Sequence, residues 1–409
     1  MKLTGFLFAA ALLGACTQAA EENYTRHVDP KIGTGGHGHV FVGANVPFGL
    51  VQVGPTSIPQ TWDWCSGYHA SDSTVIGFSH THLSGTGIGD LFDVTVMPVT
   101  GDVTYARGEE ADPASGLWSY ADRTQEIARP GYYSVPLTRY GIRAELTATA
   151  RVGLHRYTFP ASDAAAVVFD LENGGCWDKA TETHLAKEGD RTVTGWRHST
   201  GWAKDQRVYF AAEFSKPFEK FETIGDNYAR ASFRTTDGEQ VSLKVALSPV
   251  SIEGAKANLA AELPGWDFDA TAAAADKAWN DELSKVKIET EDETSKRIFY
   301  TALYHTMVAP SLFCDVNGDY RGADGKVHEN PGRDTYTTFS LWDTYRAAMP
   351  LMTVLHPERM PDIIQTMLHI SDEQGRLPVW HLWGNETDCM VGNPGIVAVA
   401  DAIVKGIGG

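Results

Sequence analysis

The chain has 409 residues, 43% of them hydrophobic and 21% charged, a composition typical of folded domains that excludes long disordered segments. This length is sufficient for two or three domains, each with its own core. A formal net charge of −18 repels the phosphates of nucleic acids, so we expect no nucleic-acid partner. Several of the 11 tryptophans lie in glycine-rich segments and favour a sugar ligand, although most are expected in the core.

The first residues have the pattern of a bacterial lipoprotein leader. Lys2 gives a positive start, an apolar run spans Phe6 to Leu13, and small residues precede Cys16. We predict that residues 1–22 are a signal peptide and tether, and that Cys16 is lipidated. The protein would be exported to the periplasm or the outer membrane, with the lipid as its membrane attachment. An ordinary signal peptide cleaved near Ala20 is the alternative.

Residues 23–265 have the pattern of an antiparallel β-sandwich. Short alternating or β-branched runs are separated by Gly, Pro, Asp and Asn, without helical segments between them. The clearest runs are residues 133–137, 154–159, 208–210 and 241–245. Many short strands without interleaved helices predict packed antiparallel sheets rather than a parallel sheet.

A linker helix is predicted next, within residues 266–292. The segment 272–286 is rich in alanine at its start and places Trp279, Leu283 and Val286 at helical spacing. This spacing predicts that one face of the helix lies against an apolar surface.

Residues 293–409 are predicted to be helical. The pattern predicts helices over 295–308, 339–355 and 361–373, and a further helix capped by Asn393 with Pro394 in its first turn. In the first of these helices the apolar face is expected to carry Ile298, Ala302, Leu303 and Met307. Fewer helices fit here than a six-hairpin α/α barrel needs. The predicted fold is therefore an N-terminal antiparallel β-sandwich followed by an incomplete α/α barrel.

Three motifs resemble ligand sites without the context that such sites need. Gly33–Gly38 matches G-x-G-x-x-G, but Pro47 prevents a helix directly after it, so no dinucleotide site is expected. Asp315–Asp319 begins like a calcium loop but has Tyr320 and Lys326 where that loop needs Gly and Glu. A polar turn near the substrate is the preferred interpretation.

The third motif is His80-Thr81-His82, which places two imidazoles on one face of a strand. A transition-metal site would need a third ligand that the sequence does not identify. We therefore expect these histidines to be hydrogen-bonded structural groups or sugar contacts.

Four cysteines follow Cys16, and in an oxidising compartment they can form disulfides. They are Cys65, Cys176, Cys314 and Cys389. Their wide spacings leave all three connectivities open.

The segment Leu377–Cys389 is the strongest candidate for catalytic chemistry. It places Glu386 and Asp388 close to Trp380, His381 and Trp383. A carboxyl group in such apolar company resists ionisation, and a raised pKa is what a general acid needs near neutral pH. A structural role for Glu386, as a cap or an ion pair, is the alternative.

Five long motifs in this order resemble the α-mannosidases of glycoside hydrolase family 92. They are Val28–His39 with Val46–Gly49, Trp62–His69, Gly77–Gly87, Phe339–Arg346 and Gly384–Cys389. The resemblance implies a β-sandwich followed by an α/α barrel, and inverting hydrolysis of α-mannosides aided by calcium.

The resemblance also implies roles for individual residues. Glu386 is implied to be the general acid. The residues implied to bind substrate are Trp62, Trp64, Asp343, Arg346 and His381. The general base, an Asp, lies in the family beyond the position that matches residue 409, and calcium ligands are expected there too, so the metal ligands stay unassigned. We accordingly expect an exo-acting α-mannosidase in incomplete form, acting on N-glycans or mannans. A glycan-binding surface lipoprotein without catalysis is the alternative.

Overall fold

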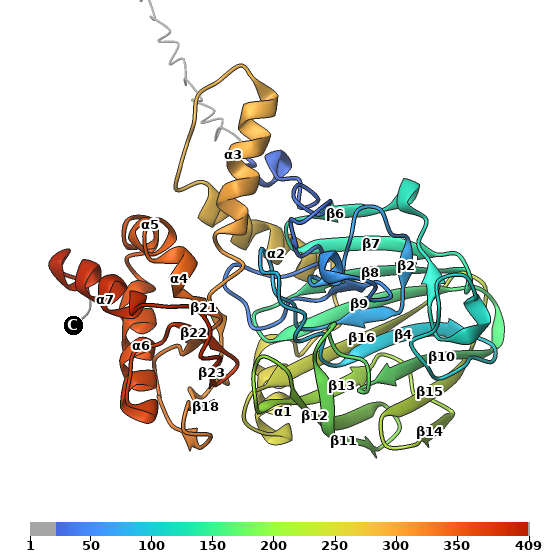
Figure 1. The fold of residues 1–409 in the computed structure, drawn as a ribbon. Coiled ribbons are helices and arrows are strands. Elements are labelled where there is room, and N and C mark those ends of the chain that lie inside the picture. Colours follow the sequence, from blue (N-terminus) through green and yellow to red (C-terminus); the bar gives the residue numbers. More distant parts are fainter. Residues whose placement is uncertain (1–21, 408–409) are drawn as a thin grey trace, which may run out of the picture.

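The computed structural model describes residues 22–407, so the predicted leader and Cys16 lie outside the described part of the chain. Two antiparallel sheets pack face to face and form the larger body, drawn from blue to yellow in Figure 1. The six-stranded sheet has the order β1 (Gly54–Thr56), β3 (Gly77–Ser79), β4 (Thr95–Thr100), β10 (Ser162–Asp170), β15 (Tyr228–Thr235) and β14 (Lys220–Ile224). The eight-stranded sheet has the order β11 (Lys179–Glu188), β12 (Thr192–Thr200), β13 (Gln206–Phe214), β16 (Glu239–Ser248), β9 (Val152–Phe159), β8 (Ile142–Ala148), β7 (Tyr132–Leu137) and β6 (Ile127–Arg129). The predicted β-sandwich is thus confirmed.

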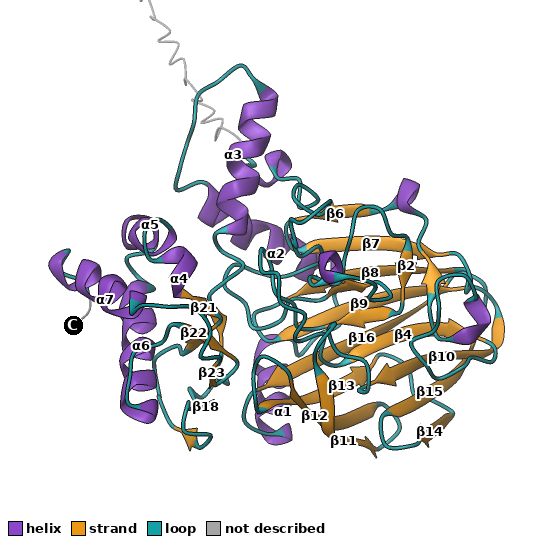
Figure 2. Cartoon of the chain, viewed as in Figure 1, coloured by secondary structure: helices purple, strands orange, loops and turns teal. Residues whose placement is uncertain are grey.

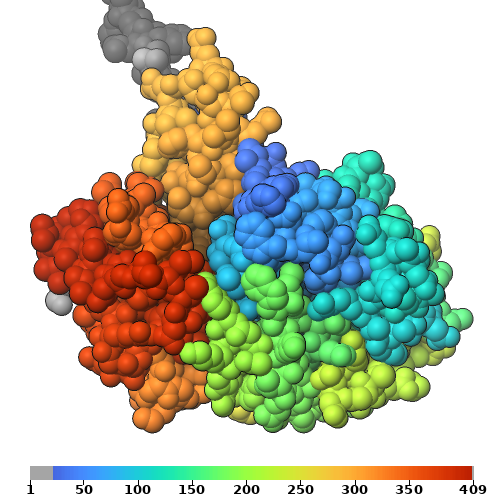
Figure 3. Space-filling model, in the orientation of Figure 1, coloured from blue at the N-terminus to red at the C-terminus, as the bar shows by residue number. Residues whose placement is uncertain are grey.

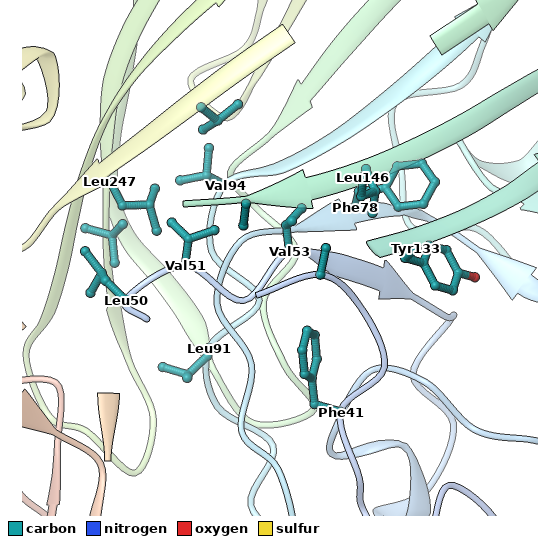
Figure 4. Packing of buried hydrophobic residues seen from close by; sticks show 14 of the residues in the cluster. Phe41, Leu50, Val51, Val53, Phe78, Leu91, Val94, Tyr133, Leu146 and Leu247 are labelled. Atoms are coloured by element: carbon teal, nitrogen blue, oxygen red, sulfur yellow. The ribbon is translucent and has the colours of Figure 1, made fainter. Parts of the chain in front are cut away.

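The core of the sandwich lies between these sheets. Side chains that alternate along each strand point inward, so Tyr133, Val135 and Leu137 of β7 are completely buried. Figure 4 shows residues of the segments before β1 and β4, such as Val51 and Val94, in one hydrophobic cluster with Leu146 and Leu247 of the larger sheet.

Seven α-helices are described within residues 22–407, and they accompany the sandwich only after its last strand (Figure 2). They are α1 (Ile252–Glu262), α2 (Phe268–Leu283), α3 (Glu293–His305), α4 (Leu341–Thr344), α5 (Ala348–Leu355), α6 (Met360–Gln374) and α7 (Pro394–Val404). Short two- and three-stranded sheets lie among them: β17 (Ser311–Leu312) with β20 (Tyr336–Thr337), β18 (Tyr320–Arg321) with β19 (Val327–His328), and β21 (Phe339–Ser340) with β22 (Trp380–Leu382) and β23 (Asn385–Glu386). A further pair, β2 (Thr74–Val75) and β5 (Ser119–Tyr120), lies beside the sandwich. None of the described helices combines the length and the apolar character needed to cross a membrane.

Helix α1 was not predicted. Its buried face consists of small or polar residues, Ala255 and Asn258, so it has little hydrophobic periodicity. The Oγ of Ser251 caps it by accepting a bond from the Gly254 N–H at 3.0 Å.

Helix α2 confirms the predicted linker helix, with shifted ends. Trp279 and Leu283 are completely buried, and the Trp279 Nε1–H donates to the Asn45 carbonyl at 2.7 Å. The helix begins at Phe268 because the Asp267 side chain accepts a bond from the Ala270 N–H. It ends at Leu283, so Val286 lies outside it.

The predicted apolar face of α3 was right for Leu303 and Met307, which are buried, and wrong for the other two residues. Ile298 is 57% exposed and Ala302 is also exposed, whereas Tyr300 and Tyr304 are buried. The two tyrosines take the core-facing positions because their hydroxyl groups find acceptors: Tyr300 donates to the Val286 carbonyl at 3.0 Å and Tyr304 to Asn45 Oδ1 at 3.3 Å.

The segment predicted as one helix over 339–355 is a strand followed by two helices. Phe339 and Ser340 pair with His381 and Trp380 of β22, which removes the first residues from the helix. Helix α6 matches the prediction over 361–373 and ends at Gly375, which adopts φ 84°. Pro394 begins α7 as expected, but the Asn393 side chain makes no capping bond.

The helices α4–α7 and the small sheets form a second body beside the sandwich (Figures 1 and 3). Its contact with the sandwich includes the loop that follows β12: Trp202 packs on Trp380 with ring centroids 4.7 Å apart, and Asp205 bonds with Asn385 through two 3.0 Å hydrogen bonds. The sequence order of a β-rich domain followed by a helical domain is therefore as predicted.

Candidate functional site

A cavity of about 260 Å³ lies where the sandwich and the helical part meet. The loop Ser84–Thr86 contributes the sandwich side, and the end of α3 with the following segment contributes His305 and Pro310. The small sheet and α4 supply the remaining wall, including Ser340, Asp343 and Trp380. Backbone bonds of Phe48 to Met307 (2.8 Å) and Leu312 (2.9 Å) hold the segment after α3 against the sandwich.

Asp343 is a carboxylate in the wall of this cavity. It lies on α4, the short helix that follows β21, and its side chain is exposed. The Ser340 hydroxyl donates to Asp343 Oδ2 and so fixes the orientation of the carboxylate. The side chain can accept hydrogen bonds from the hydroxyl groups of a ligand.

Glu386 lies directly behind the cavity wall. The strands β22 and β23 form a hairpin whose two turn residues, Trp383 and Gly384, have φ of 47° and 78°. This turn type requires left-handed backbone at both positions, which suits Gly384. The hairpin folds the half-buried Glu386 back on its own partner strand, where its oxygens accept the N–H groups of Val379 (2.9 Å) and Trp380 (3.0 Å). Trp380 lines the cavity, so Trp380 is the residue that stands between Glu386 and the cavity.

His381 lies opposite Glu386 in the antiparallel pair, so the two side chains leave the same face of the hairpin. The imidazole is only 2% exposed, and neither ring nitrogen has a hydrogen-bond partner within the described part of the chain. Burial lowers the pKa of His381 to about 3, so the ring is neutral near pH 7. It is not one of the residues that line the cavity.

The predicted tryptophans lie on the sandwich, in the 3-10 turn Trp62–Trp64. Trp62 is 47% exposed, and its Nε1–H donates to the Gly87 carbonyl at 2.8 Å, next to the cavity loop. Trp64 points to a different neighbour, with its Nε1–H bonded to Asp72 Oδ2 at 2.7 Å. Trp62 is thus placed near the cavity, and Trp64 is held by internal contacts.

Arg346 is exposed and contacts its own neighbour. Its Nε donates to the Tyr345 hydroxyl at 2.6 Å. Of the six predicted site residues, Asp343 alone lines the cavity. Glu386 is bonded to the lining residue Trp380, and Trp62 is bonded to Gly87 beside the lining residue Thr86, whereas Trp64, Arg346 and His381 are not among the lining residues. 

Two groups of this site were not predicted. His305 lines the cavity at the end of α3, and burial lowers the pKa of its imidazole. Its position at a helix end was a usable signal, but the predicted helix ran past it to residue 308. Trp202, which packs on Trp380, lies in a loop without periodicity, and its contact depends on the docking of the two bodies.

His80 and His82 are structural, one of the alternatives that the sequence left open. His80 Nδ1 bonds to the Val94 carbonyl at 2.6 Å and its Nε2 lies 2.9 Å from His155 Nε2, while Tyr157 bonds to His155 Nδ1 at 2.7 Å. All of these bonds can be made with both imidazoles neutral, and burial lowers the pKa of both rings. His82 Nδ1 bonds to the Gln52 carbonyl at 2.8 Å.

The turn Asp315–Asp319 connects domains rather than lining the cavity. Asp315 Oδ2 accepts the Ser248 hydroxyl and Oδ1 accepts the Asn258 amide, both at 2.8 Å. Burial raises the pKa of Asp315 to about 6. The turn therefore fixes β16 and α1 to the segment that leads into the helical part.

One group of side chains within residues 22–407 comes close enough together to hold a metal ion: Glu282, His356 and Glu358. It does not fit calcium, which prefers six to eight oxygen ligands, because one donor is an imidazole. The Lys285 ammonium also lies within the group, 2.7 Å from Glu282 and 2.8 Å from Glu358. These residues form an ion-pair network, and no calcium ligand set is assigned.

Comparison with protein families and solved structures places this architecture. The family model of the glycosyl hydrolase family 92 N-terminal domain matches residues 27–248, and that of the family 92 catalytic domain matches residues 254–409. The family 92 α-mannosidase BT3965 of Bacteroides thetaiotaomicron, solved with mannoimidazole, is 37% identical with a TM-score of 0.90, over 95% of this chain and 54% of that one. The family 92 inverting mannosidase BT2199 of the same organism is 28% identical with a TM-score of 0.83, over 94% of this chain and 53% of that one.

Among curated proteins, an uncharacterized secreted glycosidase of Arthroderma benhamiae is 25% identical over all of this chain and 53% of its own length. The chain thus spans about half the length of the relatives it matches. Two family models together match almost the whole sequence, and the sandwich and the helical part each correspond to one of them. The chain belongs to glycosyl hydrolase family 92.

Proposed function

We propose that this chain carries the sugar site of an exo-acting, inverting α-mannosidase that removes terminal mannose from N-glycans or mannans. The observation that carries the proposal is the cavity at the junction of the two bodies, with Asp343 in its wall and Glu386 directly behind Trp380. The solved relative with 37% identity is an α-mannosidase that binds mannoimidazole. A cavity of about 260 Å³ suits one sugar residue rather than a long glycan segment, in accord with exo action.

In this proposal Glu386 is the general acid that gives its proton to the departing glycosidic oxygen. Asp343 accepts hydrogen bonds from mannose hydroxyl groups, and Trp62, beside the loop Ser84–Thr86, offers an indole face to the sugar. Inversion needs a second carboxylate that activates water on the opposite face of the ring. We do not assign that base to any residue of this chain.

Two further features belong to the proposal. Calcium dependence rests on the family, because the described residues offer no suitable ligand set. Export rests on the leader-like N-terminus and on the secreted relative, with lipidation of Cys16 as the proposed anchor. Metabolic labelling with a fatty acid would test the anchor, since label should enter the wild-type chain and be absent after Cys16→Ala.

The test of function separates hydrolysis from binding. A form that extends over the full length of the family 92 relatives is incubated with α-1,2-mannobiose and calcium, the released sugar is followed by NMR, and binding of mannoimidazole is measured by calorimetry. The proposal predicts binding of mannoimidazole and release of mannose that first appears as the β-anomer. The α-anomer as first product would contradict inversion.

The alternative is a glycan-binding protein that does not hydrolyse its ligand. It is favoured by the cavity lining, in which Asp343 is the one carboxylate among the described residues. Binding without turnover, in the presence of calcium and unaffected by chelation, would support it. The absence of both binding and turnover would exclude both functions for this chain.

A further inference from the structure

Two of the four described cysteines lie against each other at one end of the Trp62–Trp64 turn. Cys65 is the residue that ends this turn, and its N–H donates to the Trp62 carbonyl at 3.2 Å. Cys176 lies against the same single turn, with its Sγ 3.9 Å from the Thr61 carbonyl oxygen. The Cys65 and Cys176 thiols lie close enough together that each shifts the pKa of the other.

The segment that carries Cys176 is fixed in this position by its own backbone. The Gly175 N–H donates to the Leu91 carbonyl at 3.0 Å, and the Trp177 N–H donates to the Gly89 carbonyl at 2.9 Å. The approach is so close that a Cβ on Gly89 would lie 2.6 Å from the Cys176 Cβ. The contact between the two thiols therefore does not depend on a mobile side chain alone.

From this juxtaposition we propose that Cys65 and Cys176 form a disulfide bond when the protein meets an external small-molecule disulfide, which acts as the oxidant. The bond would join the turn that carries Trp62 to the segment before β11, which backbone hydrogen bonds already hold against the loop after Ser84–Thr86. It selects among the connectivities that spacing left open. It does not depend on the proposed mannosidase activity, although its formation in the cell requires export.

The order of attack follows from exposure and charge. Cys176 is partly exposed whereas Cys65 is completely buried. The Cys65 thiol, and then the Arg107 guanidinium, lower the pKa of Cys176, and the Cys176 thiol raises the pKa of Cys65. The Cys176 thiolate would attack an external disulfide and displace one thiol. The Cys65 sulfur would then attack the mixed disulfide at Cys176 and displace the second. The two cysteines lose two electrons and two protons, and the external disulfide becomes two thiols.

The other two cysteines have no such neighbour. Cys314 is buried, and its Sγ accepts bonds from Arg151 and the Thr335 N–H. Cys389 lies in the segment between β23 and α7. They serve as internal controls in the same molecule.

The test is peptide mapping of the unaltered chain. The purified protein is equilibrated with millimolar oxidised glutathione, free thiols are blocked, and tryptic peptides are identified by mass spectrometry. Cleavage after Lys and Arg places the two cysteines in peptides 32–107 and 157–179. We expect these peptides to be recovered as one cross-linked species, separable by reductant, while peptides with Cys314 and Cys389 carry the blocking group.

Reduction gives a second readout. Since the bond closes a loop of roughly 110 residues, reduction should lower the melting temperature by about 5–10 °C. Cys176→Ser should remove this difference, and Cys389→Ser should retain it. The proposal would be overturned if, after oxidation, the peptides of Cys65 and Cys176 carried the blocking group. A cross-link of either residue to another cysteine would also overturn it. These two contradicting results are both read from peptide mapping of the unaltered chain. They therefore do not depend on whether the variants fold or on whether mannosides are hydrolysed.

Discussion

Trp202 of the sandwich and Trp380 of the helical part pack with ring centroids 4.7 Å apart and an interplanar angle of 57°. Trp380 also lines the cavity and provides the N–H that holds Glu386. The contact between the two bodies and the position of the proposed acid are therefore parts of one arrangement. A change at this contact should affect both stability and ligand binding.

Asn385→Ala tests that contact. The side chain accepts the Asp205 N–H and donates to the Asp205 carbonyl, both at 3.0 Å, and also donates to the Trp383 carbonyl at 2.8 Å. Its loss should lower the free energy of unfolding by about 1–3 kcal/mol. Urea denaturation measures this effect, and calorimetry with mannoimidazole should show weaker binding. Asn385→Asp keeps the acceptor and should lose less. Unchanged stability and binding in the alanine variant would contradict the account.

Asp343→Asn tests the cavity. Asparagine has a similar shape and keeps one acceptor oxygen, but it loses the charge that strengthens hydrogen bonds to sugar hydroxyls, so the Kd for mannoimidazole should rise about tenfold. The melting temperature should change little because the side chain is exposed. Asp372→Asn is the matched control on an exposed position of α6. Equal affinities of the two variants would remove Asp343 from the sugar site.

The buried histidines predict a dependence of stability on pH. Burial lowers the pKa of His80 to about 3 and that of His82 to about 4, below the ordinary value of about 6.5. Below pH 6.5 the unfolded chain binds these protons and the folded chain does not. Each residue should therefore reduce the free energy of unfolding by about 1 kcal/mol per pH unit between about 6.5 and its folded value.

Imidazole NMR signals measure this directly. The signals of His80 and His82 should not titrate between pH 7 and 5. A midpoint near pH 6 for His80 would show that burial does not hold the imidazole neutral.

Asp315 predicts the opposite trend. Burial raises its pKa to about 6, so between pH 4 and 6 the folded chain binds more protons than the unfolded chain. Its contribution to stability is complete below about pH 4 and is lost as the pH rises through 6. Asp315→Asn does not titrate, so the stability of the wild type relative to this variant should fall by about 2–3 kcal/mol from pH 4 to 7. Urea denaturation at the two pH values measures the difference, and a constant difference would contradict the shift.

The sequence predicted the parts of the fold that depend on local periodicity. Alternation identified β7, β9, β13 and β16, and the Gly375 signal identified the end of α6. Where tertiary contacts decide, the prediction failed. The segment 339–355 is broken because Phe339 and Ser340 pair with a strand some forty residues later in the chain. Tyr300 and Tyr304 displace Ile298 from the core because Asn45 and Val286 supply acceptors.

The candidate site was predictable to a similar degree. The motifs indicated Asp343, Trp62 and Glu386, which lie in or beside the cavity wall. The separation of Trp64 from the cavity could not be inferred, because it depends on which acceptor each indole N–H finds. Trp202 could not be recognised either, since its role follows from how the two bodies dock. His305 was missed because the predicted helix ran past the end of α3.

The most direct test of the account compares Glu386→Gln with the wild type on two leaving groups, both in a form that extends over the full length of the family 92 relatives. A general acid matters for a poor leaving group such as the sugar of α-1,2-mannobiose, and little for dinitrophenolate, which departs without a proton. With Glu329→Gln as an exposed control, the Glu386 variant should lose about 10²–10⁴-fold in kcat on the disaccharide and far less on dinitrophenyl α-mannoside. Equal losses on both substrates, or no loss on the disaccharide, would contradict the assignment of Glu386 as the proton donor.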